Sequence, residues 1–301
     1  MVEYVGIDIG GTNIRIGAIN KDENLIFEYK EPTYRDVVTR EDLYNKIKKL
    51  VKMVPNYENI KAIGIGVPGS VDRQLGQVIT STNVSILNKF PLTENLKKDF
   101  NKPTFLENDA RVATFAEAIK GKGKEKNIVC YITISTGLGG GVVIDKNIYH
   151  GSTNLGAYFS RMILDGENTS NSLISGTALL KQAKEKINKN IKSTFELFDL
   201  EKNKNPIARE IVKDFKRNLT VLLLNISSII NPDIILLGGG VLKSKDRFLL
   251  EVIESFREKA HPLAKNTIIE TAEFKEPGII GAALLSKAEN GNIMNNMKGQ
   301  K

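Results

Sequence analysis

The sequence predicts an α/β protein with an internal duplication, and three patterns support this prediction. Residues 4–9 and 14–19 have the apolar character of two strands that flank a Gly-Gly-Thr turn. A similar strand, threonine-glycine turn and strand return at residues 128–144. Apolar residues at helical spacing separate these strand-rich stretches, and strands that alternate with helices are typical of an α/β fold.

The first half continues this alternation. The stretch DLYNKIKKLVKMV predicts a helix, because its apolar residues recur every three or four positions, and IKAIGIGV then predicts a buried strand. Residues 103–118, PTFLENDARVATFAEA, predict an apolar strand, an acidic junction and an alanine-rich helix. Each of these helices would cover a sheet formed by the strands.

The second half contains a longer helical pattern. Its apolar positions run from Ile211 to Ile230, and the helix is expected to stop at Asn231-Pro232, because a proline disfavours helix in the preceding residue. The stretch DIILLGGGV then predicts a strand that meets a glycine turn. The final residues, ENGNIMNNMKGQK, have little to bury and are expected to be loose.

Composition excludes several classes of protein. The 301 residues suffice for one or two domains, and the single cysteine, Cys130, excludes a disulfide framework and is expected to be a core thiol. The net charge of +8 comes from lysines scattered among acidic residues, which favours solvated faces over nucleic-acid binding. No apolar run is long enough to span a membrane and no targeting segment is recognised, so we expect a cytoplasmic protein without a membrane partner.

Two glycine turns are candidates for phosphate binding. Glycine lets backbone N–H groups approach an anion, and a threonine hydroxyl adds a donor. The turns at 10–12 and 136–141 lack the spacing and the Gly-Lys-Ser/Thr ending of a P-loop, which excludes that class of nucleotide site. Each turn alone is also explained as a tight turn; their recurrence, together with Gly238-Gly239-Gly240 after a third strand, favours a shared ligand. The GIGVPG stretch at 64–69 contains a proline and opens no helix pattern, which argues against a dinucleotide fingerprint.

The triplet Glu107-Asn108-Asp109 places carboxylates where a strand meets a helix, at the end of the predicted sheet. Asn108 or Asp109 could instead cap the helix, and the sequence leaves both readings open. The two histidines carry less weight. His150 is interpreted as a turn residue after a strand, and His261 lies before a proline in a charged stretch.

In this order, the motifs resemble those of the ROK family (repressors, open reading frames and kinases), within the actin/hexokinase-like ATPase superfamily. The resemblance covers nearly the whole chain. The residues that carry it are 8–15 (DIGGTNIR), 66–69 (GVPG), 107–110 (ENDA), 136–141 (TGLGGG), 231–232 (NP), 238–240 (GGG) and 278–283 (GIIGAA).

The resemblance implies two ribonuclease-H-like (actin-like ATPase) lobes, each a mixed β-sheet flanked by helices, with ATP and a sugar in the interlobe cleft. It implies an N-terminal lobe over residues 1–108, to which residues 284–301 could return, and a C-terminal lobe over residues 109–283. Family members also suggest a homodimer.

The resemblance also implies roles for individual residues. Asp109 would be the general base, with a near-normal pKa, and would take the proton of a sugar hydroxyl. Asp8 would face the Mg²⁺ ion that accompanies ATP. The other implied contacts with ATP are Gly10, Gly11, Thr12, Asn13, Thr136, Gly137, Gly239 and Gly240. The implied contacts with the sugar are Gly69, Asn83, Asn108 and Asp109.

The segment that begins at Gly151, GSTNLGAYFSRM, departs from the family pattern. Family kinases usually carry Gly-Glu-x-Gly-His in this segment. In this sequence, Tyr158 stands at the position of the glutamate and Arg161 at the position of the histidine. The cysteines of the family's zinc cluster are missing from residues 162–185, so we predict no structural zinc. Tyr158 and Arg161 together suit an acceptor-rich group such as an amide carbonyl.

This pattern resembles certain zinc-free bacterial N-acetylmannosamine kinases of sialic acid and amino-sugar catabolism, which phosphorylate the C6 hydroxyl. The sequence therefore favours an ATP-dependent kinase for N-acetylmannosamine. A hexokinase-type enzyme for glucose, fructose or another hexose is the alternative, and a catalytically inactive sugar-sensing ROK protein is a second. A DNA-binding repressor is disfavoured, because the first hairpin begins at residue 4 and no helix-turn-helix region precedes it in this sequence.

Overall fold

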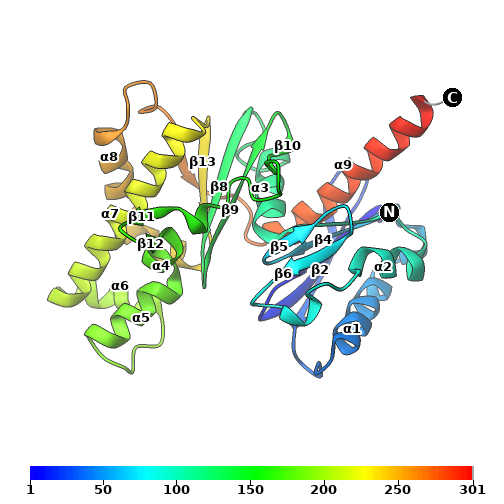
Figure 1. The fold of residues 1–301 in the computed structure, drawn as a ribbon, viewed down its shortest axis with the longest axis horizontal. Coiled ribbons are helices and arrows are strands. Elements are labelled where there is room, and N and C mark those ends of the chain that lie inside the picture. Colours follow the sequence, from blue (N-terminus) through cyan, green and yellow to red (C-terminus); the bar gives the residue numbers. More distant parts are fainter. Residues whose placement is uncertain (300–301) are drawn as a thin grey trace. The chain divides into compact units, whose positions relative to one another are not determined.

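The computed structural model describes residues 1–299 and contains two compact units, each built around its own β-sheet (Figure 1). The first unit contains residues 1–124 and 146–156 together with the chain from Phe274 onward. The second contains residues 125–145 and 157–273. The predicted α/β fold, with two mixed sheets flanked by helices, is confirmed.

The first unit begins with the strand pair expected from the sequence. Its strands and helices are β1 (Tyr4–Ile9), β2 (Asn13–Ile19), β3 (Leu25–Pro32), α1 (Arg40–Met53), β4 (Ala62–Val67), β5 (Ser70–Asp72), β6 (Gln77–Thr80), α2 (Leu92–Phe100), β7 (Thr104–Asn108), α3 (Asp109–Ile119), β10 (Asn147–Ile148) and α9 (Pro277–Gly299). Short 3-10 helices lie at Tyr57–Asn59 (η1) and Ser85–Leu87 (η2). Strands β5 and β6 pair with each other in a small separate sheet.

The five-stranded sheet of this unit has the order β3-β2-β1-β4-β7. β1 is antiparallel to β2 and parallel to β4, and β4 is parallel to β7. Asp8 pairs in register with Gly66, and Val67 pairs with Asn108. Because neighbouring parallel strands end at the same edge, Asp8 and Asn108 lie at the carboxyl edge of one sheet, where ligands of α/β proteins commonly bind.

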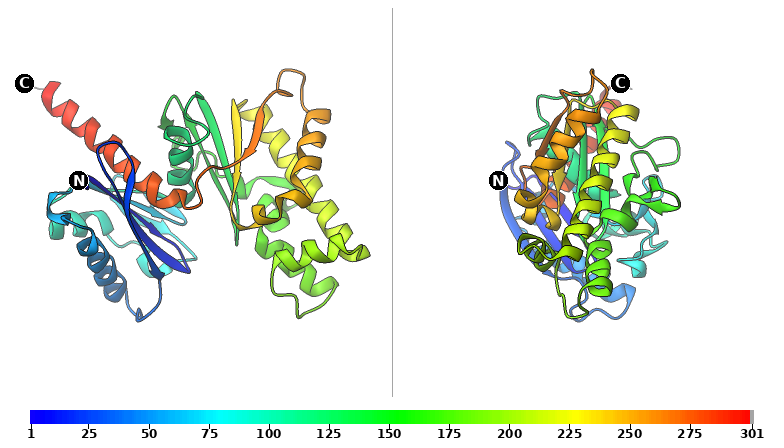
Figure 2. Two further views of the ribbon diagram at one scale, coloured as in Figure 1. Left: turned by 180° about the vertical axis from the view of Figure 1, so that it is seen from behind. Right: turned by 90° about the vertical axis from the view of Figure 1, so that its left-hand side faces the viewer.

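Apolar alternation decides which helices cover each face of this sheet. Ile7 of β1 and Ile65 of β4 belong to the same buried cluster as Leu43 and Ile47 of α1. The alternate positions, Gly6 and Gly64, face α9 instead, which runs alongside the blue N-terminal strands in the left view of Figure 2.

The close approach of α9 requires a glycine in β4. A Cβ atom on Gly64 would overlap the backbone carbonyl oxygen of Ala282. Any side chain there would push the helix away from the sheet. The alternation of glycine and isoleucine in AIGIGV therefore gives β4 two different faces. The isoleucines pack with other side chains, and the glycines allow the backbone of a helix to approach.

The second unit repeats the arrangement. Its strands and helices are β8 (Ile128–Ile134), β9 (Leu138–Ile144), β11 (Ile163–Asp165), β12 (Asn168–Thr169), α4 (Ser170–Ile174), α5 (Gly176–Lys186), α6 (Thr194–Lys202), α7 (Pro206–Ile229), β13 (Ile234–Gly238), α8 (Leu249–Lys259) and β14 (Ile268–Thr271), with 3-10 helices at Phe159–Arg161 (η3) and Gly240–Arg247 (η4). The larger sheet has the order β10-β9-β8-β13-β14. β8 is antiparallel to β9 and parallel to β13, so the predicted duplication is visible in the pairing pattern.

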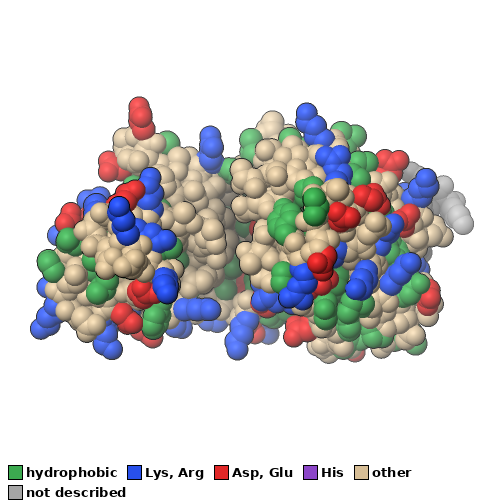
Figure 3. Space-filling view, turned by 90° about the horizontal axis from the view of Figure 1, so that it is seen from below, with side chains coloured by type: hydrophobic (Ala, Val, Ile, Leu, Met, Phe, Trp, Pro, Cys, Tyr) green, Lys and Arg blue, Asp and Glu red, His purple; other side chains and the backbone are tan. Residues whose placement is uncertain are grey.

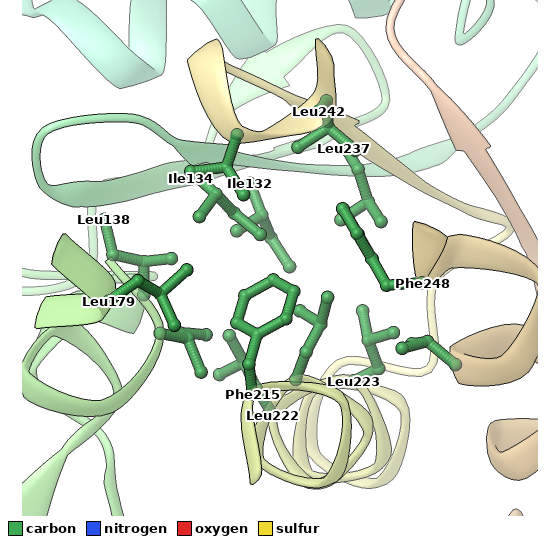
Figure 4. Packing of buried hydrophobic residues seen from close by; sticks show 14 of the residues in the cluster. Ile132, Ile134, Leu138, Leu179, Phe215, Leu222, Leu223, Leu237, Leu242 and Phe248 are labelled. Atoms are coloured by element: carbon green, nitrogen blue, oxygen red, sulfur yellow. The ribbon is translucent and has the colours of Figure 1, made fainter. Parts of the chain in front are cut away.

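The core of the second unit lies between its sheet and α7. Figure 4 shows Phe215 and Leu222 of α7 pointing toward Ile132 of β8, with Phe248 beside them. The rings of Phe215 and Phe248 meet edge to face, with their centroids 5.0 Å apart. Cys130 is fully buried in this core, as predicted, and burial raises the pKa of its thiol.

Two expectations differ from the structure. The predicted boundary between residues 108 and 109 would separate α3 from the first unit, but α3 packs against α9 and contacts β4 and β7, so residues 109–124 belong with the first sheet. The tail, expected to be loose, continues α9 as far as Gly299; residues 300–301 lie outside the described part of the chain. Extending an existing helix costs far less free energy than starting a new one. Apolar periodicity in the sequence does not reveal such an extension.

The surface agrees with the interpretation of the lysines as solvated. On the face drawn in Figure 3, lysine and arginine side chains are spread among acidic ones. Within residues 1–299, no helix is both long enough and apolar enough to cross a membrane.

Candidate active site

Asn108 and Asp109 mark the junction at which β7 ends and α3 begins. The side-chain oxygen of Asn108 accepts hydrogen bonds from the N–H groups of Ala110 (3.0 Å) and Arg111 (3.2 Å), which makes Asn108 the cap of α3. Its side-chain amide donates to the carbonyl oxygen of Gly69 at 3.0 Å. The capping role that the sequence left open thus belongs to Asn108, and the same side chain joins the junction to Gly69.

Gly69 has the conformation that such a junction requires. Its φ of +105° lies in the region that favours glycine, and a Cβ atom there would overlap the carbonyl oxygen of Thr80. Two of the predicted sugar-binding positions, Gly69 and Asn108, are therefore in direct contact at the edge of the first sheet.

Asp109 is the first residue of α3 and is half-buried. One of its carboxylate oxygens accepts a hydrogen bond from the N–H of Ala110 at 2.8 Å. Burial raises the pKa of Asp109, and the hydrogen bonds from Ala110 and Asn108 offset only part of this effect. The expectation of a near-normal pKa is therefore wrong for the ligand-free protein.

Asp8 lies close enough to Asp109 for the two charges to interact. Burial raises the pKa of Asp8 to about 7; the charge of Asp109 adds to the rise, and the guanidinium of Arg15 opposes it. Arg15 stands opposite Asp8 in the β1–β2 pairing and binds its carboxylate at 3.1 Å. Arg15 also contacts Glu276 at 2.9 Å, just before α9 begins.

The surroundings of Asp8 fit a magnesium ion that arrives with a nucleotide. Mg²⁺ is commonly bound through one or two carboxylates together with phosphate oxygens and water. A buried carboxylate whose charge is unfavourable by itself gains from a nearby cation. Among the side chains that the structure describes, no cluster of three or more His, Cys, Asp or Glu could hold a metal alone, so the phosphates would have to supply further ligands.

The first glycine turn connects β1 to β2. The N–H of Gly10 donates to the carbonyl oxygen of Asn13 at 2.9 Å, and the Thr33 hydroxyl donates to the Gly10 carbonyl at 2.6 Å. The Thr12 side chain is exposed. Gly11 faces Asn83, which would lie 3.1 Å from a Cβ atom on Gly11. The structure thus brings the predicted phosphate turn next to a predicted sugar-binding residue.

In the second unit, the other glycine turn connects β8 to β9. The N–H of Thr177, in the first turn of α5, donates to the carbonyl of Thr136 at 3.1 Å, while Thr136 and Gly137 themselves are exposed. Gly239 follows the neighbouring strand β13, and its backbone lies against Ile134 at the end of β8. The predicted ATP-binding positions of this unit therefore gather at one edge of its sheet, with Gly240 next in the chain.

Tyr158 precedes a single turn of 3-10 helix in the second unit, and Arg161 is the last residue of that turn. The buried ring of Phe159 anchors this turn, while Tyr158 keeps 39% of its surface exposed and Arg161 is also exposed. Within the described residues, neither side chain has a hydrogen-bond or ion-pair partner. Both are available to a ligand.

Sequence reasoning missed the partners of Glu107. This side chain is fully buried, and its carboxylate meets His150 at 2.6 Å and Arg73 at 3.2 Å through one oxygen. The other oxygen accepts the N–H of Asn108 at 2.8 Å and lies 3.4 Å from Arg111. Burial alone would raise the pKa of Glu107, but the bond to His150, its charge, the Asn108 N–H and Arg111 together hold the pKa below its usual range.

His150 follows strand β10, as the sequence predicts, and its side chain also binds Glu107, which the sequence analysis did not anticipate. A glutamate inside an apolar strand pattern signals a buried charge, and a buried charge needs partners. That signal was present in the stretch PTFLEND. It could not identify His150 or Arg73, because both are distant in the chain.

Comparison with known proteins shows the family of this chain. The model of the ROK family matches residues 4–289. The chain belongs to the ROK family.

Several known proteins are similar to this chain over most of their length. A glucokinase of Streptomyces coelicolor is 28% identical, with 94% of this chain and 97% of that protein covered. An N-acetylmannosamine kinase of Vibrio cholerae is 30% identical, with coverages of 79% and 83%. The crystal structure of a ROK hexokinase from Thermus thermophilus superposes with a TM-score of 0.85 at 26% identity, and covers 96% of this chain and 99% of its own.

Proposed function

We propose that this ROK protein is a sugar kinase that transfers the γ-phosphate of ATP to the C6 hydroxyl of N-acetylmannosamine, in the breakdown of sialic acid and related amino sugars. The observation that carries the kinase activity is the Asn108–Asp109 junction. There a half-buried carboxylate stands beside an amide that is already fixed to Gly69, at the sheet edge that also holds Asp8.

The donor side is supported by the two glycine turns. In this proposal, the residues that contact the phosphates of ATP are Gly10, Gly11, Thr12, Asn13, Thr136 and Gly137. Gly239 and Gly240 border the adenosine. Asp8 would hold the Mg²⁺ ion that accompanies ATP, and this ion would neutralise charge on the phosphates.

Asp109 acts as the general base. It accepts the proton of the attacking hydroxyl as that oxygen bonds to the γ-phosphorus and the bond from phosphorus to the bridging oxygen of ADP breaks. Its raised pKa strengthens it as a proton acceptor once it is ionised. Phosphoryl transfer needs little covalent chemistry from the protein, so the main task of Asn108, Gly69 and Asn83 is to orient the sugar.

Tyr158 and Arg161 give the preference for an N-acetylated sugar. Both side chains are exposed and lack partners among the described residues, and both can donate to the carbonyl oxygen of an acetamido group. They replace the glutamate and histidine that the ROK pattern usually supplies. We further propose that no structural zinc is present, that the enzyme is a homodimer, and that it works in the cytoplasm, where ATP is available.

A kinase for glucose or another hexose is the second candidate. It is favoured by the glucokinase relative, which covers more of this chain than the N-acetylmannosamine kinase relative does. A catalytically inactive sugar sensor is less well supported, because Asp8, Thr12 and Asp109 are all retained.

A coupled ADP-release assay with Mg-ATP separates these candidates. The panel holds N-acetylmannosamine, N-acetylglucosamine, glucose, mannose, fructose and allose, and NMR of the product identifies the phosphorylated carbon. We expect turnover on N-acetylmannosamine, and Arg161→Ala should raise the KM for that sugar by about 10-fold because it removes a charged hydrogen-bond donor.

The KM for ATP of Arg161→Ala should stay unchanged. Turnover on a plain hexose alone would contradict the assignment to N-acetylmannosamine and keep the kinase. No turnover on any sugar would favour the inactive sensor.

A further inference from the structure

Residues 146–156 group with the first unit, although the chain on both sides of them belongs to the second. They include the short strand β10, which pairs with β9. We refer to residues 146–156 as the crossing segment. It ends two residues before Tyr158.

The crossing segment is fastened to both ends of α3. The Lys146 ammonium donates to the carbonyl oxygen of Ala118 at 2.9 Å, near the C-terminus of α3, where a positive charge is favourable. At the other end, the buried Arg111 guanidinium donates to the carbonyls of Asn154 (2.8 Å) and Gly156 (3.0 Å). The segment therefore follows α3 from its last turn back to its first.

His150 adds a third attachment, and this one reaches the catalytic junction. Its Nε2 atom lies 2.6 Å from the buried carboxylate of Glu107. The other oxygen of that carboxylate accepts the N–H of Asn108 at 2.8 Å. An imidazole can donate through Nε2 whether or not its other nitrogen carries a proton, so the contact suits the acceptor-only carboxylate.

The segment also closes on itself around His150. The N–H of Gly156 donates to the carbonyl oxygen of His150 at 2.7 Å, so residues 150–156 form a closed loop. The contact between the His150 ring and Glu107 therefore restrains the whole loop. Without the ring, the loop would keep its hydrogen bonds from Arg111 but lose its contact with Glu107.

We propose that His150 is a positioning residue for the sugar acceptor. His150, in the crossing segment, binds one oxygen of the Glu107 carboxylate. The other oxygen binds the backbone N–H of Asn108, so this one carboxylate connects the crossing segment to the Asn108–Asp109 junction. The role toward the sugar rests on the proposed kinase function. Among the described residues, the turn at Gly10–Thr12 makes no hydrogen bond or ion pair with Glu107 or His150, so we expect donor binding to change little when His150 is replaced.

The test compares two substitutions of the same residue with a control. His150→Leu removes the donor but keeps bulk, and His150→Gln keeps an N–H donor at similar reach. His261→Leu is the matched control, because His261 is the only other histidine in the sequence and is exposed in the second unit. All four proteins are measured by hydrogen exchange with mass spectrometry, by steady-state kinetics and by thermal unfolding.

We expect His150→Leu to accelerate amide exchange across residues 150–156 by about 10-fold and to raise the KM for the sugar by about 10-fold, as expected for losing a hydrogen bond to a charged group. The KM for ATP should change by less than about 2-fold, and His150→Gln should restore both properties to within about 3-fold of the wild type. His261→Leu should behave as the wild type.

Unchanged exchange in His150→Leu would overturn the proposal. So would equal increases in the KM for ATP and for the sugar with a lowered unfolding temperature in both His150 variants, since that pattern indicates general damage. If the wild type phosphorylates no sugar, the proposed function fails, whereas faster exchange in His150→Leu with rescue by His150→Gln would still support the attachment itself.

Discussion

At the scale of single residues, the feature that defines the candidate site is a pair of carboxylates at one sheet edge. Asp8 and Asp109 are both desolvated, and the charge of Asp109 adds to the rise in the pKa of Asp8. Arg15 compensates Asp8 only in part, because it also binds Glu276. In the ligand-free protein, the ionised form of Asp8 is therefore unfavourable, and a bound cation would stabilise it.

This feature predicts a pH dependence of stability. The pKa of Asp8 rises from 3.8 to about 7 on folding, so the folded state binds the Asp8 proton more tightly than the unfolded state. The contribution of Asp8 is fully present below about pH 4 and is lost as the pH rises through about 7. Relative to Asp8→Asn, the wild type should lose on the order of 3 kcal/mol between these limits.

Urea unfolding at pH 4.5 and pH 8, in EDTA and without nucleotide, measures this difference. We expect Asp8→Asn to gain stability over the wild type as the pH rises. A difference between the two proteins that stays constant, or that shrinks toward pH 8, would contradict the raised pKa of Asp8.

Sequence analysis identified these residues but not their partners. The glycine turns, Asp8, Asn108 and Asp109 stand out because their local patterns are informative. The pairing of Asp8 with Arg15 follows from the hairpin register, which the strand pattern could have given. The contact between Glu107 and His150 could not be predicted, because it joins residues 43 positions apart that share no periodic pattern.

At the scale of elements, α9 covers one face of the first sheet and packs against β1 and β4. Its backbone approaches β1 and β4 so closely that Gly6 and Gly64 leave no room for a side chain. The strand patterns predicted β1, β2, β4 and the helix α1 well, because each has strong apolar periodicity. The length of α9 was missed because its final residues lack such periodicity.

Two glycine substitutions test the packing of α9. Gly64→Ala should lower the free energy of unfolding by about 3 kcal/mol, because the new Cβ would overlap the Ala282 carbonyl oxygen and neither backbone can move easily. Gly291→Ala, on α9 itself, meets no neighbour within 4 Å and should raise stability by about 0.5–1 kcal/mol through helix propensity alone.

Chemical unfolding of the two variants beside the wild type provides the measurement. Equal and small effects would mean that α9 does not pack against β4 as described. A large loss in Gly291→Ala would likewise contradict the open surroundings of that residue.

At the scale of the whole molecule, one strand pairing pattern is used twice. Each unit combines an antiparallel hairpin with parallel strands, and each presents a glycine turn at the edge of its sheet. The sequence predicted this duplication from its two hairpins and the ROK family from the order of its motifs. It misplaced α3, because a strand followed by a helix gives no sign of which sheet the helix joins.

The central claim is that Asp109 of this ROK protein takes the proton of a sugar hydroxyl during phosphoryl transfer. Asp109→Asn keeps the size and hydrogen bonding of the side chain but removes the base, and Asp22→Asn, at an exposed position between β2 and β3, is the control. In the ADP-release assay with the preferred sugar, Asp109→Asn should reduce kcat by about 10²-fold or more with both KM values near normal, while Asp22→Asn should match the wild type. A kcat for Asp109→Asn within about 3-fold of the wild type would contradict the assignment of Asp109 as the base.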